Sequence, residues 1–122
     1  MRFAFYDNRE DIYPQSVDLT QEEIIELITT KTELACFFES CRGKKCPQKN
    51  TQAFSPIEIE GSRHNAHVKS VSLLVFEVDG VQHDVIDRIV RALKGYQYGA
   101  YTTHSHRGGE GVWSLRFLVW LS

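Results

Sequence analysis

The spacing of apolar residues predicts the elements of the N-terminal part of the chain. Residues 1–6 alternate aromatic and small positions, which predicts a short strand. Thr20 and Glu23 form a capping-box pattern, and the isoleucines and leucine around them predict a helix at about 20–30. Residues 34–38 are apolar, but the run is too short for periodicity to distinguish a strand from a helix.

The longest apolar run of the chain lies between residues 68 and 79. Its branched side chains predict a strand that is buried on both faces and that ends at Gly80. Apolar residues then recur at helical spacing, which predicts an amphipathic helix at about 82–94 that stops before Gly95.

The remaining segments are predicted from their turn residues and short apolar stretches. Residues 39–56 have no apolar period and are predicted to form a basic loop, followed by an extended piece through Ile59. Residues 98–103 and 112–121 are predicted strands, and a glycine-rich turn at 107–111 separates them.

The order of these elements and the composition together predict one α+β domain. The chain has 122 residues, of which 42% are apolar and 11% aromatic, so it can build a single core and is not intrinsically disordered. We therefore expect a single domain over residues 1–122, with a mixed β-sheet and helices packed on one face.

Composition alone identifies no partner. The 14 Lys and Arg residues nearly balance the 16 Asp and Glu residues, so a nucleic-acid partner would have to be met by a local patch. No apolar run reaches the roughly 18 residues of a membrane span, and the first residues do not resemble a signal peptide. A cytoplasmic location without a membrane partner is therefore expected.

The three cysteines, Cys36, Cys41 and Cys46, are spaced five residues apart. An odd number argues against a disulfide framework, and the spacing differs from that of the short zinc knuckles, so free thiols are predicted. Zinc binding with His64 or His67 as a fourth ligand is the alternative.

Two carboxylates lie near the end of the long apolar strand. Because residues two apart in a strand share a face, Glu77 and Asp79 are predicted to lie side by side. Such an oxygen-rich pair suits Mg²⁺ or Mn²⁺ and is typical of two-metal phosphoryl-transfer sites. The alternative is a strand end that exposes two acids to water before a turn.

A row of polar residues follows the next predicted strand. If the strand persists, Thr102, His104 and His106 share a face and can hydrogen-bond a phosphate, with Arg107 or Arg116 adding charge. A transition-metal site and the polar rim of a strand entering a turn are the alternatives.

The two motifs in this order resemble the archaeo-eukaryotic primase superfamily, and within it the primase-polymerase domains of phage, plasmid and integrative-element replication proteins. The resemblance covers roughly residues 53–121 and implies an RRM-like catalytic core, of which this chain is similar to the N-terminal part. The matching segments are Ser55-Pro56, Arg63 to Val68, Leu73 to Gly80, Tyr101 to His106 and Arg116 to Val119.

The resemblance also implies roles for the matching residues. Glu77 and Asp79 would ligate the divalent ions, His106 or His104 would contact the phosphates of a nucleoside triphosphate, and Arg116 would support that site. Family members carry a third carboxylate beyond the last strand seen here, so the chain is expected to end before it. A helicase domain is the partner expected downstream in a full-length protein.

A cluster of cations is predicted to contact a single-stranded DNA template. Lysine and arginine on a loop suit sequence-independent phosphate binding, whereas a solvated loop is the alternative. The cations are Arg42, Lys44, Lys45, Lys49 and Arg63.

The sequence therefore predicts a DNA primase/polymerase-like nucleotidyltransferase module. Two further hypotheses stay open. One is a non-catalytic module that binds nucleotides or single-stranded nucleic acid, and the other is a metal-dependent nuclease.

Overall fold

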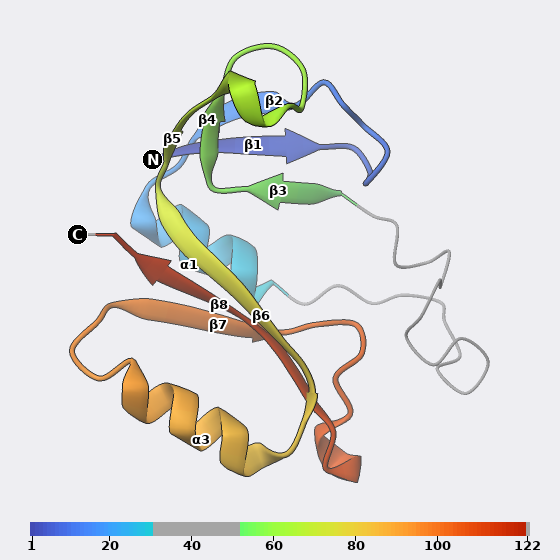
Figure 1. The fold of residues 1–122 in the computed structure, drawn as a ribbon, viewed down its shortest axis with the longest axis vertical. Coiled ribbons are helices and arrows are strands. Elements are labelled where there is room, and N and C mark those ends of the chain that lie inside the picture. Colours follow the sequence, from blue (N-terminus) through green and yellow to red (C-terminus); the bar gives the residue numbers. More distant parts are fainter. Residues whose placement is uncertain (31–51, 122) are drawn as a thin grey trace.

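Residues 1–30 and 52–121 are described by the computed structural model, and they form an α+β domain with two α-helices and three small sheets (Figure 1). The first sheet has the order β2-β1-β3. Its strands are β1 (Arg2–Tyr6), β2 (Gln15–Asp18) and β3 (Ala53–Ser55). Strand β1 was predicted, whereas β2 was not, and β3 lies in a segment predicted as loop.

A two-stranded sheet and a three-stranded sheet complete the described residues. The two-stranded sheet pairs β4 (Ile57–Ile59) with β5 (Val68–Val71), and the short 3-10 turn η2 (Asn65–His67) lies directly before β5. The three-stranded sheet has the order β6-β8-β7. Its strands are β6 (Leu73–Val81), β7 (Tyr98–Thr102) and β8 (Trp113–Trp120), and the 3-10 turn η3 (Gly108–Glu110) precedes β8.

The strands pair differently from the sequence prediction. Each pairing between the named strands of the described residues is antiparallel, so the expected mixed sheet is replaced by antiparallel sheets. The α+β class is confirmed.

Helix α1 (Gln21–Thr29) begins at the predicted capping box. The Thr20 hydroxyl accepts the Glu23 backbone N–H at 3.2 Å, and the Glu23 carboxylate accepts the Thr20 N–H at 3.2 Å. These bonds satisfy two of the N–H groups that every helix start leaves without an intrahelical partner. The cap thereby fixes the start of a helix that buries Ile24 and Ile28.

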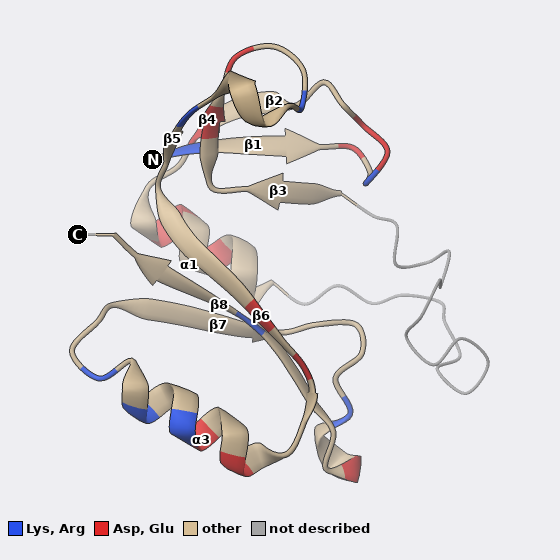
Figure 2. Ribbon diagram, in the orientation of Figure 1, with Lys and Arg blue, Asp and Glu red and all other residues tan. Residues whose placement is uncertain are grey.

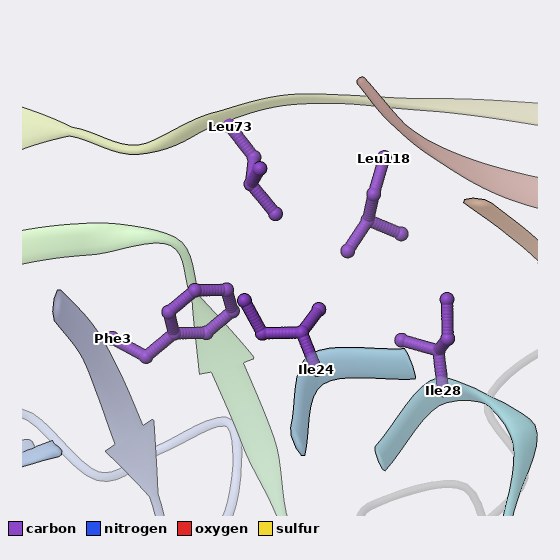
Figure 3. Packing of buried hydrophobic residues seen from close by; sticks show 5 residues of the cluster. All are labelled: Phe3, Ile24, Ile28, Leu73 and Leu118. Atoms are coloured by element: carbon purple, nitrogen blue, oxygen red, sulfur yellow. The ribbon is translucent and has the colours of Figure 1, made fainter. Parts of the chain in front are cut away.

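Helix α1 packs between the first sheet and the β6-β8-β7 sheet (Figures 1 and 3). Its buried isoleucines meet residues from both sheets in one apolar cluster. The cluster consists of Phe3, Ile24, Ile28, Leu73 and Leu118. Burial of each large side chain in this cluster contributes roughly 1.5–3 kcal/mol to stability. The cluster therefore holds the two sheets together.

Helix α3 (His83–Ala92) lies on the opposite face of the β6-β8-β7 sheet. It buries Ile86 against Phe117, whereas α1 packs on Leu118, the next residue of β8. Successive side chains of a strand point to opposite faces, so the two helices cover opposite faces of this sheet. The prediction that the helices pack on one face is therefore wrong for the β6-β8-β7 sheet.

The prediction of one long strand that is buried on both faces is also wrong. It divides at Ser72 into β5 and β6, and Leu74 is 53% exposed, so the segment is not buried on both faces. Gly80 does not end β6: it has a positive φ of 65° and lies where the register with β8 shifts, as in a β-bulge.

Within residues 1–30 and 52–121, no helix combines the length and apolar character needed to cross a membrane. The predicted elements at 34–38, most of the basic loop and the three cysteines lie outside the described residues.

Candidate functional site

Glu77 and Arg116 face each other across β6 and β8, with Tyr101 on the other side of Arg116. Arg116 donates from one guanidinium nitrogen to Glu77 Oε2 at 3.2 Å and from the other to the Tyr101 hydroxyl at 3.0 Å. Figure 2 shows the acidic bands of β6 beside the basic band of β8. A polar row therefore crosses all three strands on the face that carries Leu118.

Arg116 stays cationic in this row. Partial burial tends to lower its pKa, but Tyr101 and Glu77 outweigh burial and raise the pKa of Arg116 above its ordinary value. The Arg116 side chain is 37% exposed, so its charge is held in place and still reaches solvent. Such a group can exchange one anionic partner for another.

Asp79 and Ser114 form the second polar contact between β6 and β8. The buried Ser114 hydroxyl donates to Asp79 Oδ1 at 2.7 Å and accepts the Gly80 backbone N–H at 3.0 Å. Because Ser114 and Arg116 are two residues apart, they share a face of β8. Glu77 and Asp79 therefore lie on one face of the sheet, as the sequence predicts.

His106 joins the same end of the sheet through Ser114. Its Nδ1 accepts the Ser114 backbone N–H at 3.1 Å, so in the neutral ring the proton is on Nε2. The ring also stands edge-on to Trp113, with the ring centres 4.9 Å apart. His106 and Asp79 are thereby held on either side of one serine.

The predicted row of Thr102, His104 and His106 does not form. Strand β7 ends at Thr102, and the chain then turns, with the His106 N–H bonded to the Thr103 carbonyl at 3.0 Å. Thr102 pairs with Leu115, a residue of the α3 face, and so lies on the face opposite Arg116. The premise of a strand that persists to residue 106 is wrong.

The predicted cations take different positions. Arg107 forms an ion pair with Glu110 in the turn before β8. Arg63 lies near the first sheet, with its guanidinium carbon 5.4 Å from the centre of the Tyr6 ring. The loop cations Arg42, Lys44, Lys45 and Lys49 lie outside the described residues.

Among the described residues, the metal donors that lie together at this site are the carboxylates of Glu77 and Asp79. No group of three or more acidic, histidine or cysteine side chains that could hold a metal occurs in the part of the chain that the structure describes. Glu77 is paired with Arg116, and Asp79 is bonded to Ser114. The described residues thus offer a metal two carboxylates, one of which is already paired with a guanidinium group.

Comparisons with known proteins add no relative. No family model, curated protein or solved structure matches this chain. The resemblance to primases therefore rests on the motifs themselves.

Sequence reasoning missed two residues of this site, Ser114 and Tyr101. A signal for Ser114 exists: Ser114 and Arg116 alternate with Trp113, Leu115 and Phe117, which predicts one polar edge of an otherwise apolar strand. The partner of each residue follows from the strand register and could not be read from the sequence.

Proposed function

We propose that this chain is a nucleotide-binding module of a replication protein of a mobile or phage-derived element, acting in the cytoplasm. The observation that carries the proposal is that two distant motifs meet on β8. Glu77 contacts Arg116, and Asp79 and His106 both bond to Ser114. A nucleoside triphosphate is the proposed ligand, bound through its phosphates at this end of the sheet.

The described side chains can supply the hydrogen-bond donors that a phosphate needs. Arg116 carries a permanent charge, and a phosphate oxygen can replace the Glu77 carboxylate as its acceptor. The Tyr101 hydroxyl already lies 3.0 Å from the guanidinium, and the neutral His106 ring carries a donor on Nε2. Phosphate binding would thus proceed by exchange of partners at Arg116.

Mg²⁺ or Mn²⁺ fits this site incompletely. When bound, such an ion polarises phosphate oxygens and neutralises developing charge. The oxygens of Glu77 and Asp79 are of the kind it prefers, but Arg116 already neutralises Glu77, and no third ligand accompanies them in the described residues. Binding without catalysis is therefore the function that these residues support best.

Primase/polymerase-like nucleotidyl transfer is the second candidate. It is favoured by the shared face of Glu77 and Asp79, and it requires a further carboxylate from outside the described residues. In that case the single-stranded DNA template would be held by the proposed basic loop, and a helicase domain would accompany the module.

One set of assays separates these functions. We expect the chain to bind dATP and a labelled single-stranded oligonucleotide, with weaker oligonucleotide binding at higher salt, and to incorporate no nucleotide with Mg²⁺ or Mn²⁺. Incorporation that disappears in the Glu77→Ala, Asp79→Ala double variant would establish transfer instead. Metal-dependent degradation of the oligonucleotide without dATP would establish a nuclease, and absence of binding would refute the proposal.

A further inference from the structure

Ser114 is the residue through which the two halves of the candidate site are connected. It is completely buried in β8, with none of its surface exposed. A buried serine in a strand of large apolar residues leaves its hydroxyl in need of partners, because an unpaired buried hydroxyl is costly. Every polar atom of Ser114 has such a partner in this structure.

The side chain of Ser114 organises the β6 side of the site. Its hydroxyl donates to Asp79 Oδ1 at 2.7 Å, a short bond of the charge-assisted kind. The same oxygen accepts the Gly80 N–H at 3.0 Å, where the register of β6 against β8 shifts. The hydroxyl therefore fixes both the carboxylate and the backbone that carries it.

The main chain of Ser114 organises the β7 side of the site. Its N–H donates to His106 Nδ1 at 3.1 Å, and its carbonyl accepts the Thr103 N–H at 3.0 Å. In the neutral ring, the first bond selects the tautomer with the proton on Nε2. The second holds the turn that brings His106 back to the sheet.

We infer that Ser114 is a positioning residue for the nucleotide site, and this inference rests on the proposed function. It touches no ligand: its hydroxyl aims the Asp79 carboxylate, and its backbone fixes the orientation and the proton position of His106. Outer residues of this kind commonly change affinity by about 10- to 100-fold in metal sites when they are removed.

The test compares Ser114→Ala, which removes the hydroxyl, with Ser114→Cys, whose larger thiol donates only weakly, and with Ser70→Ala as the control. Ser70 also bonds a carboxylate, Glu58 Oε2 at 3.2 Å, but on the exposed surface of the β4-β5 sheet. Three readouts are made on the full chain: hydrogen exchange of the Gly80 amide, the protonated nitrogen of His106 by NMR, and the dissociation constant for dATP.

We expect wild type and Ser70→Ala to protect the Gly80 amide and to carry the His106 proton on Nε2. In Ser114→Ala and Ser114→Cys, exchange at Gly80 should accelerate by roughly tenfold, as loss of one hydrogen bond of about 1–1.5 kcal/mol implies. The Asp79 carboxylate released by loss of the hydroxyl can then compete with the phosphates for Arg116, which lies on the same face of the sheet, so the dissociation constant for dATP should rise by about tenfold in both variants and stay unchanged in Ser70→Ala.

Two results would overturn the inference. Wild-type protein with an unprotected Gly80 amide or with the His106 proton on Nδ1 contradicts the hydrogen bonds themselves, and this readout needs no variant to fold. Wild-type affinity for dATP in Ser114→Ala contradicts the positioning role while leaving nucleotide binding intact. If wild type fails to bind dATP, the proposed function fails, and the positioning role at a nucleotide site fails with it.

Discussion

At the scale of single residues, Gly108 is the position where packing around His106 leaves no room for a side chain. A Cβ at Gly108 would lie 2.7 Å from His106 Nε2 and 3.1 Å from its Cε1, whereas a Cβ at the neighbouring Gly109 would meet nothing within 4 Å. The glycine pair before β8 therefore contains one constrained and one unconstrained position.

This contrast predicts that Gly108→Ala displaces the His106 ring and that Gly109→Ala does not. We expect Gly108→Ala to lower the free energy of unfolding by about 1–3 kcal/mol, as other forced contacts do, and to shift the NMR signals of His106. Gly109→Ala should be neutral within about 0.5 kcal/mol. Equal effects of the two substitutions in urea unfolding would show that His106 is not packed against Gly108.

At the scale of elements, the capping box of α1 is a local feature that contributes to the free energy of unfolding of the whole domain. Thr20→Ala removes the hydroxyl that accepts the Glu23 N–H but keeps the Thr20 backbone N–H that donates to Glu23, and it should cost about 1 kcal/mol of unfolding free energy, measured in urea. Thr29→Ala is the matched control, because the Thr29 hydroxyl donates to the Ile25 carbonyl at the other end of the helix. A loss in Thr29→Ala as large as that in Thr20→Ala would contradict the capping role.

The loop between β1 and β2 makes the stability of the fold depend on pH in the acidic range. The Asp11 carboxylate accepts the backbone N–H groups of Asp7 at 3.0 Å and Tyr13 at 2.9 Å, and these bonds, with help from Arg63, hold its pKa below the ordinary value of 3.8. Because the folded pKa is the lower one, the stabilisation is complete above the ordinary pKa and is lost as pH falls through the folded pKa.

We therefore expect the thermal midpoint of the wild type to fall as pH is lowered below about 4, and Asp11→Asn to weaken this dependence. Part of the dependence should remain in the variant, because the N-terminal ammonium also lowers the pKa of Asp18. A variant with the same acid dependence as the wild type would show that Asp11 does not contribute.

The elements that the sequence predicted well are those with local signals. The capping box predicted α1, and the helical spacing before Gly95 predicted α3, because both signals lie within the sequence of the helix itself. The division at Ser72 and the bulge at Gly80 were missed because both depend on pairing with distant strands. Period-two patterns indicate which residues share a face but not which element covers that face.

At the scale of the whole molecule, the same limit applies to the candidate site. The pattern correctly placed Glu77 and Asp79 on one face, but it could not identify Arg116 as the partner of Glu77 or Ser114 as the partner of Asp79. The shared face of His104 and His106 was predicted for a strand that persists beyond residue 103, and β7 ends at Thr102. Long-range register decides these contacts, and it emerges only when β6, β8 and β7 assemble into one sheet.

The measurement that tests the central claim most directly is isothermal titration of the full chain with dATP. Wild type and Arg88→Gln, which removes an exposed helix-surface arginine 3.5 Å from Asp84, should bind alike. Arg116→Gln should raise the dissociation constant by about tenfold or more, because a charged hydrogen bond contributes roughly 1.5–3 kcal/mol. Equal affinity of wild type and Arg116→Gln, or no binding by the wild type, would contradict a phosphate site at Arg116.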